Sequence, residues 1–305
     1  MRISKTMIGI LVQIANGVDN LPELALKTGL SRNRCSELAI EMERAHFLVR
    51  ERPGMKMRLR LSDSPIAASF REMYLAKPYM KYLDFLYGTK LDLLQLLIYG
   101  PKGVSVLAKI TNTSKATVRN NLRSLRYANL LWREKSKYLF AKKAHPSIYS
   151  FLNSLRTFTP ENKRILWKFN EEELFRTRKK PMITELTGFN RYINFGVEVR
   201  TIDYFCIVPV RKLEKKEILA HSLLQIGDEP RLLGLAIAFY LKNHLESINL
   251  DFLISKYDLD GLFEEFIKTI RMLKAGEDRI ENTKIPSITR SEIERILNMY
   301  GVKNV

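Results

Sequence analysis

Two groups of basic and amide side chains have the types and spacing needed for directed hydrogen bonding, and each group follows a serine. The first group comprises Ser31, Arg32, Asn33 and Arg34. The second comprises Ser114, Lys115, Thr117, Arg119, Asn120 and Arg123. Arginine and lysine can donate to guanine O6 and N7, asparagine can pair with adenine, and all three can hold phosphate. These groups favour contact with a nucleic acid, and a solvated amphipathic helix is the alternative interpretation.

The elements that must position these side chains are two helices. The Ser114 hydroxyl can accept a free backbone amide at the start of a helix. After it, Val118, Leu122 and Leu125 recur at i, i+4 and i+7 and form one apolar face. The basic and amide residues lie off that face, where solvent or a partner can reach them. Ser31 is expected to cap a corresponding helix.

The sequence around each serine occurs twice without a gap. An offset of 83 residues aligns Leu24–Glu51 with Leu107–Glu134. Identical residues at matched positions include the two serines and the Arg-Glu pairs that end the two stretches. A repeat of this length is too long for a solenoid unit, so it indicates a duplicated small domain.

Each helix is followed by a stretch that predicts a β-hairpin. Apolar and basic residues alternate on both sides of Pro53-Gly54, and a second hairpin is expected from Leu130–Glu134 and Tyr138–Ala141. The basic residues of the first hairpin are Arg50, Arg52, Lys56, Arg58 and Arg60, and those expected in the second turn are Lys135 and Lys137. Because Glu51 is the only acidic residue in the first hairpin, phosphate contact is favoured over simple solvation.

Both copies resemble winged helix-turn-helix domains, as found in tandem in archaeal-type transcriptional regulators. The resemblance covers roughly the first half of the chain, as residues 1–77 and 78–157. It implies that the start of each third helix enters a major groove and that each hairpin is a wing that holds flanking phosphates or the minor groove. The partner implied is double-stranded DNA.

The second half, residues 158–305, predicts a different domain. Arg164–Phe169 and Ile202–Val210 are expected to be strands, residues 171–181 a charged helix, and the chain from Leu213 onward a set of helices. The fold class predicted for the whole chain is mainly α with small β-hairpin wings, an α+β arrangement. Its C-terminal α/β domain would end in a helical bundle and serve in dimerisation, effector binding or partner binding.

A second resemblance covers about residues 165–245. Leu186-Thr187-Gly188-Phe189, followed by Gly196-Val197 and a hydrophobic strand, is similar to the C-terminal domain of AbiEi-type antitoxins. The resemblance implies an antitoxin that represses its own promoter and neutralises a nucleotidyltransferase toxin. This chain departs from that pattern because it has two winged-helix copies. A toxin protein and a second copy of the chain are therefore further candidate partners.

Charge is distributed unevenly along the 305 residues, whose net charge is +18. Residues 1–157 hold 27 Lys plus Arg and 11 Asp plus Glu, whereas residues 158–305 hold 24 and 22. This asymmetry favours a polyanion partner for the first half. An anionic membrane surface would need a basic helix with an apolar aromatic face, which is not found, and no apolar run approaches about 18 residues. We therefore expect no membrane partner.

Cysteine usage and known motifs exclude several other classes. The only two cysteines form no CxxC, which excludes a disulfide framework and a zinc ribbon. With no secretion signal, a cytoplasmic protein is expected. Scarce Gln with abundant Lys, Arg, Glu and Ile is a thermophile-like balance. GxxxxGK[ST], GxGxxG and HExxH are absent, and the four histidines are scattered, so we expect no enzyme activity, cofactor or metal.

The leading hypothesis is a sequence-specific double-stranded DNA-binding transcriptional regulator. The antitoxin is one alternative, and an RNA-binding protein is another, because phosphate dominates the affinity for both nucleic acids.

Overall fold

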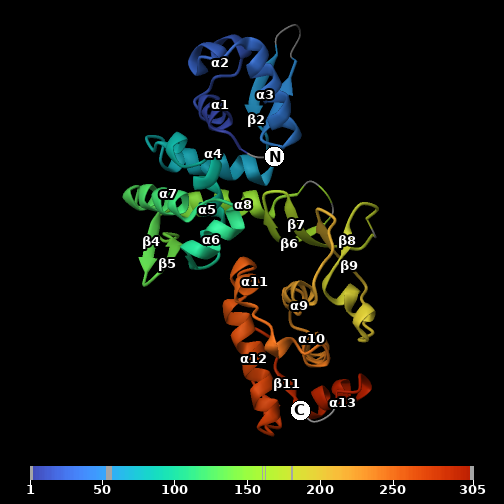
Figure 1. Ribbon diagram of the computed structural model, residues 1–305. Helices are drawn as coiled ribbons and strands as arrows, with labels where there is room; N and C mark the ends of the chain where they lie inside the picture. Colours follow the sequence, from blue (N-terminus) through green and yellow to red (C-terminus); the bar gives the residue numbers. More distant parts are fainter. Residues whose placement is uncertain (1–2, 53–56, 160, 162, 180, 303–305) are drawn as a thin grey trace. The chain divides into compact units, whose positions relative to one another are not determined.

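The computed structural model describes residues 3–52, 57–159, 161, 163–179 and 181–302 (Figure 1). The chain divides into two compact units, Met1–Phe158 and Thr159–Val305. Each unit has its own hydrophobic core.

The first copy of the repeat forms three helices, a two-stranded hairpin and a fourth helix. These are α1 (Lys5–Ala15), α2 (Leu21–Thr28), α3 (Arg32–Arg44), β1 (Leu48–Glu51), β2 (Arg58–Leu61) and α4 (Pro65–Ala76). The hydroxyl of Ser31 accepts from the amide of Arg34 and begins α3, as the sequence predicts. Leu24, Met42 and Leu59 are at most 1% exposed, so helices and hairpin share one core.

The second copy repeats this order. It comprises η1 (Tyr82–Asp84), α5 (Gly88–Leu97), β3 (Lys102–Gly103), α6 (Val104–Thr111), α7 (Lys115–Tyr127), β4 (Leu131–Glu134), β5 (Lys137–Phe140) and α8 (Pro146–Thr157). The offset of 83 residues carries the bounds of α2 onto those of α6, α3 onto α7, and β1 onto β4. The sequence repeat is therefore a structural repeat. The strand order in this copy is β3-β5-β4.

The second hairpin is four residues shorter than the first. Leu48 pairs with Leu61 in the first hairpin, and the matching Leu131 pairs with Phe140 in the second. Lys135 occupies the tight turn with a φ of 52°. Lys137, which was expected in this turn, is instead the first residue of β5 and pairs with Glu134. The prediction placed Lys137 wrongly because the turn has only two residues.

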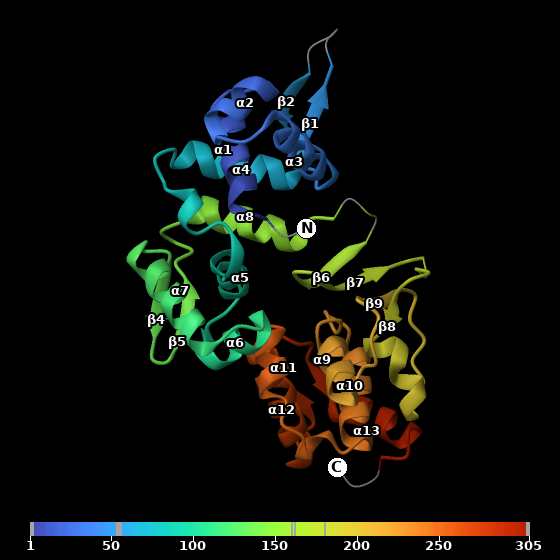
Figure 2. The ribbon, with the colours of Figure 1, turned by 45° about the horizontal axis from the view of Figure 1, so that its top comes forward.

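The two copies are joined within the first unit by α4 and α8, which lie side by side (Figure 2). The rings of Phe70 and Phe151 meet edge to face with centroids 5.4 Å apart. Lys77, just after α4, donates to the carbonyl of Ala144 at 3.2 Å. The copies are therefore packed against each other through the helix that ends each one.

The second unit begins with a four-stranded sheet and continues with helices. Its elements are β6 (Arg164–Phe169), β7 (Glu172–Thr177), β8 (Glu185–Leu186), η2 (Gly188–Phe195), β9 (Tyr204–Val208), α9 (Lys215–Leu223), α10 (Pro230–Lys242), η3 (Leu245–Ser247), α11 (Asp251–Lys256), α12 (Asp260–Lys274), β10 (Arg279–Ile280), β11 (Ile288–Thr289) and α13 (Arg290–Met299). The apolar helix α10 packs against α9 and α13. Its Phe239 is fully buried and stacks on Tyr192 with ring centroids 3.9 Å apart.

Two predictions for the second unit are wrong. Residues 171–181 were expected to be a charged helix, but Glu172–Thr177 is strand β7. Its acidic residues are matched by neighbours: Glu173 lies opposite Lys168 on β6, and their side chains form an ion pair of 2.7 Å. The strand order is β6-β7-β9-β8, and the pairings are antiparallel. The described part of the unit is therefore α+β, and no parallel pairing, which the expected α/β arrangement implies, is found among its described strands.

A buried chain of hydrogen bonds connects the sheet of the second unit to its helices. His221 of α9 lies between the hydroxyls of Thr187, 2.6 Å away, and Tyr257, 2.8 Å away. Tyr257 donates onward to the carboxylate of Glu172 at 3.0 Å, and Lys256 donates to the same carboxylate at 2.7 Å. Burial lowers the pKa of His221 to about 3, so this imidazole is neutral.

Candidate nucleic-acid interface

Helix α7 presents the predicted contact residues to solvent. The Ser114 hydroxyl accepts from the amide of Thr117 at 3.0 Å, which fixes the start of the helix. Val118, Leu122 and Leu125 are at most 1% exposed and anchor one face in the core. The predicted residues are all exposed: Ser114, Lys115, Thr117, Arg119, Asn120 and Arg123. The apolar face therefore determines which side of α7 is available to a partner.

The exposed residues of α7 do not form a single stripe. Arg119, Arg123 and Arg126 follow at i, i+4 and i+7, so they lie on one flank of the helix. Asn120 and Thr117 project from other parts of the exposed surface. Arg126 was not among the predicted contact residues, although its spacing from Arg119 was a visible signal.

The arginine stripe borders a hollow of about 630 Å³ in the second copy. Its lining comprises Gly103, Val104, Ser105, Val106, Arg119, Arg123, Arg126, Arg133, Ser136 and Tyr138. Four of these residues are arginines, and this lining contains no acidic residue. Helix α6 begins at the hollow without a side-chain cap or an acidic residue in its first turn. The hollow is therefore strongly cationic.

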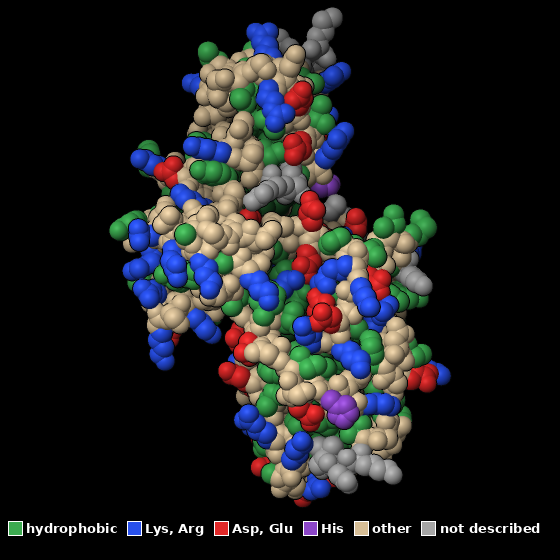
Figure 3. All heavy atoms as spheres, viewed as in Figure 1, with side chains coloured by type: hydrophobic (Ala, Val, Ile, Leu, Met, Phe, Trp, Pro, Cys, Tyr) green, Lys and Arg blue, Asp and Glu red, His purple; other side chains and the backbone are tan. Residues whose placement is uncertain are grey.

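The arginines of this hollow are not neutralised by nearby carboxylates. Within the part of the chain that the structure describes, no ion pair involves Arg119, Arg123, Arg126 or Arg133. Arg133 donates to the carbonyl of Lys135 at 3.0 Å, and its guanidinium lies 5.8 Å from the centre of the Tyr138 ring. Figure 3 shows Lys and Arg side chains gathered over α7 and the β4–β5 hairpin. Among the described residues, these arginines can therefore accept an anion without first breaking an ion pair.

Helix α3 presents the corresponding residues of the first copy, also to solvent. Ser31, Arg32, Asn33 and Arg34 are all exposed. Arg34, however, forms an ion pair of 2.8 Å with Glu37 on the next turn of the helix. The start of α3 is therefore accessible but partly neutralised.

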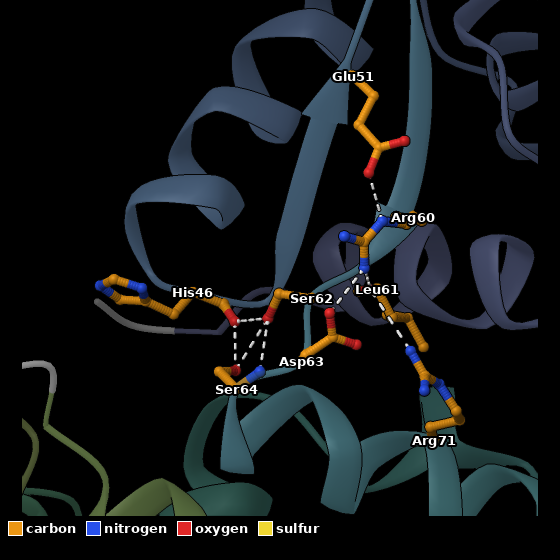
Figure 4. Close-up of polar contacts among 8 residues, drawn as sticks. All are labelled: His46, Glu51, Arg60, Leu61, Ser62, Asp63, Ser64 and Arg71. Carbon is orange, nitrogen blue, oxygen red and sulfur yellow. Dashed lines mark hydrogen bonds and ion pairs between the residues drawn. The ribbon is translucent and has the colours of Figure 1, made fainter.

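The first hairpin is neutralised more extensively. Arg50 pairs with Glu43 of α3 at 2.6 Å, and its hydrogen bond lowers the pKa of that carboxyl. Arg60 lies between Glu51, at 2.5 Å, and Asp63, at 3.1 Å (Figure 4).

In the same hairpin, Nε of Arg58 lies 3.5 Å from a carboxylate oxygen of Asp19. Glu51 is the only acid of the hairpin itself, as the sequence shows, but the fold brings Glu43, Asp19 and Asp63 to these arginines from outside it. Arg52 is exposed, and Lys56 lies outside the described residues.

The base of the first hairpin is held by serines, which fixes its direction. The hydroxyls of Ser62 and Ser64 both donate to the carbonyl of His46, the latter at 2.6 Å (Figure 4). Ser64 also caps α4 by accepting from the amide of Ala67. These hydrogen bonds therefore fix the position of the hairpin relative to the end of α3.

The second hairpin keeps its cations exposed. Lys135 at its turn and Lys137 at the start of β5 are both exposed. Trp132 on β4 is 63% exposed, which is unusual for so large an apolar side chain. The second copy therefore offers the more open cationic surface of the two.

No helix among the described residues combines the length and the apolar character needed to cross a lipid bilayer. In the same residues, no group of three or more His, Cys, Asp and Glu side chains is arranged to hold a metal ion. Comparisons of the chain with protein-family models, curated proteins and solved structures find no match. A function for this surface must therefore follow from its own chemistry.

Proposed function

We propose that each half of the first unit is a winged helix-turn-helix domain and that the chain is a sequence-specific, double-stranded DNA-binding transcriptional regulator. The observation that carries the proposal is the exposed arginine stripe of α7, which faces solvent without an acidic partner among the described residues. A helix that presents arginine, lysine and asparagine from its first turns suits the major groove.

The proposed contacts divide into two kinds. Lys115, Arg119 and Asn120 lie in the first two turns of α7, where side chains of a recognition helix reach base edges. Arg133 and Lys135 lie on the hairpin, where they would hold phosphates and fix the register of the protein on the duplex. The first group would give specificity, and the second would give affinity that does not depend on sequence.

The two copies would contribute unequally. Arg50 of the first copy must release Glu43 before it can hold a phosphate, and Arg60 must likewise release Glu51. Ion pairs near the protein surface are worth about 0–1 kcal/mol each, so exchanging the carboxylate for a phosphate is feasible but reduces the free energy gained on binding. We therefore expect the second copy to provide most of the affinity.

The proposal is tested by titrating the full chain with a fluorescent duplex at several salt concentrations. Neutralising phosphates releases counterions, so affinity should fall steeply between about 50 and 200 mM salt. Arg123→Ala should lower the slope of log affinity against log salt by about one unit if Arg123 contacts one phosphate. The matched control is Arg178→Ala, which removes an exposed arginine from the second unit and should leave the slope unchanged. Binding that is absent at low salt, or insensitive to salt, would contradict the proposal.

A further inference from the structure

The two copies differ in charge at the same place in the fold. At the four arginine positions of the hollow, the second copy has Arg119, Arg123, Arg126 and Arg133, and the first copy has Ser36, Ile40, Glu43 and Arg50. The element bounds match under the same offset, so these positions correspond structurally. The fold therefore forms with only one arginine of the four, and the other three are not needed to build it.

One of these positions reverses its charge. In the first copy, Glu43 binds Arg50 at 2.6 Å, and the two side chains are 33% and 26% exposed. In the second copy, the counterpart of that carboxylate is Arg126, and it lines the same hollow as Arg133. An attractive pair has become a like-charged pair, whose repulsion opposes folding. A bound anion would remove that repulsion.

The chemistry of the hollow identifies the anion. Guanidinium groups match the oxygens of phosphate in a bidentate geometry, and Ser105 and Ser136 add hydroxyl donors. Four guanidinium charges exceed what one phosphate can balance, and a hollow of about 630 Å³ has room for more than one. A single carboxylate would leave most of these donors unused.

We propose that this hollow is a binding site for a ligand with two or more linked phosphate groups. The ligand is either a pair of adjacent phosphates in a nucleic-acid backbone or a soluble oligophosphate. The first source rests on the proposed function: Arg123, Arg126 and Arg133 of the hollow would be the main contact of the second copy with backbone phosphates, while Arg119 faces the base edges. The second source does not need that function, and makes the hollow a site for a small molecule that can be filled while a duplex is bound elsewhere on the chain.

The test measures binding of inorganic tripolyphosphate to the full chain by isothermal titration calorimetry. Arg126→Glu installs the residue of the first copy, and we expect it to pair with Arg133 as Glu43 pairs with Arg50. Lys143→Glu is the matched control, because Lys143 is an exposed cation of the same copy outside the hollow. Arg123→Ile, which also installs the first copy's residue, serves if Arg126→Glu fails to fold by circular dichroism.

We expect one tripolyphosphate per chain and a loss of about tenfold or more in affinity for Arg126→Glu, because charge-assisted hydrogen bonds are lost. Lys143→Glu should change the affinity by less than about twofold, since salt screens a distant surface charge. Absence of saturable binding, or an equal loss in both variants, would overturn the proposal.

A competition arm distinguishes the two sources. If a duplex prevents tripolyphosphate from binding, backbone phosphates occupy the hollow. If both bind together, the ligand is a soluble oligophosphate. If the chain binds no duplex but still binds tripolyphosphate with the expected variant effects, the proposed function fails while the assignment of the hollow stands.

Discussion

At the scale of single residues, the value of an arginine to a polyanion depends on whether a carboxylate already holds it. Arg50 and Arg133 occupy matched positions in the repeat and illustrate both states. Arg50 is bound to Glu43, whereas Arg133 shares its hollow with Arg126. The difference arises from one acidic residue on the preceding helix and not from the arginine itself.

Removing that acid should strengthen DNA binding by the first copy. Glu43→Gln frees Arg50, and we expect the affinity for a duplex to rise by about two- to fivefold, the equivalent of a surface ion pair of up to about 1 kcal/mol. Glu41→Gln is the control, because Glu41 is exposed on the same helix and, among the described residues, pairs with no cation. Fluorescence anisotropy would measure both variants, and an equal rise in the two would show that net charge alone is responsible.

His221 should make the stability of the second unit depend on pH. Its folded pKa is about 3, whereas an unfolded histidine has a pKa of about 6.5. Between these values the unfolded state binds a proton that the folded state excludes, so stability is greatest above about pH 6.5 and falls as the pH is lowered. The expected loss approaches about 1.4 kcal/mol for each pH unit.

Urea unfolding between pH 7 and 5, followed by the fluorescence of Trp167 in a Trp132→Phe background, would measure this loss. His221→Gln should be less stable at pH 7, because Thr187 and Tyr257 lose part of their hydrogen bonding, but its stability should vary less with pH. An unchanged pH dependence in the variant would assign the effect to other groups.

At the scale of elements, a serine determines where each exposed helix begins. Ser114→Ala should lower the free energy of unfolding by about 1 kcal/mol, because the amide of Thr117 loses its acceptor. Ser114→Asp keeps an acceptor there and should preserve stability, yet its charge should weaken duplex binding. Thermal unfolding and anisotropy would separate the two effects, and equal destabilisation by Asp and Ala would contradict the role of the cap.

The elements that sequence predicted correctly are those with local causes. The caps at Ser31 and Ser114 precede apolar residues at helical spacing, and both helices begin where expected. The strand Arg164–Phe169 was likewise predicted correctly. Strand β7 was mistaken for a helix because its acids suggested a solvated surface. Glu172 and Glu173 are paired instead with cations outside the strand, Glu172 with the distant Lys256 and Glu173 with Lys168 of the neighbouring strand.

For the candidate site too, the sequence predicted correctly only those features that have a local cause. Exposure of Arg119 and Arg123 follows from the apolar face of α7, which the sequence shows directly. The ion pair between Arg58 and Asp19 could not be predicted from the sequence, because it depends on how the loop before α2 meets the hairpin. The hollow beside Arg126 likewise forms only when helix, hairpin and the start of α6 come together.

At the scale of the whole molecule, the basic excess is confined to one of the two units. The first unit holds 27 basic and 11 acidic residues, and the second holds 24 and 22. Many charges of the second unit face each other in ion pairs, such as Lys163 with Glu173 and Arg211 with Glu217. The charge asymmetry therefore favours the first unit, and not the second, as the site of the proposed polyanion binding.

The most direct test of the central claim compares duplex sequences selected by the full chain from a random pool with scrambled duplexes of equal length. If α7 reads base edges, Arg119→Ala should weaken binding to the selected duplex by about 1–3 kcal/mol. The same variant should bind the scrambled duplex almost as well as the unaltered chain does. Lys143→Ala should change the affinity for both duplexes equally. If the pool yields no preferred sequence, or if Arg119→Ala weakens both duplexes to the same extent, α7 does not read DNA sequence.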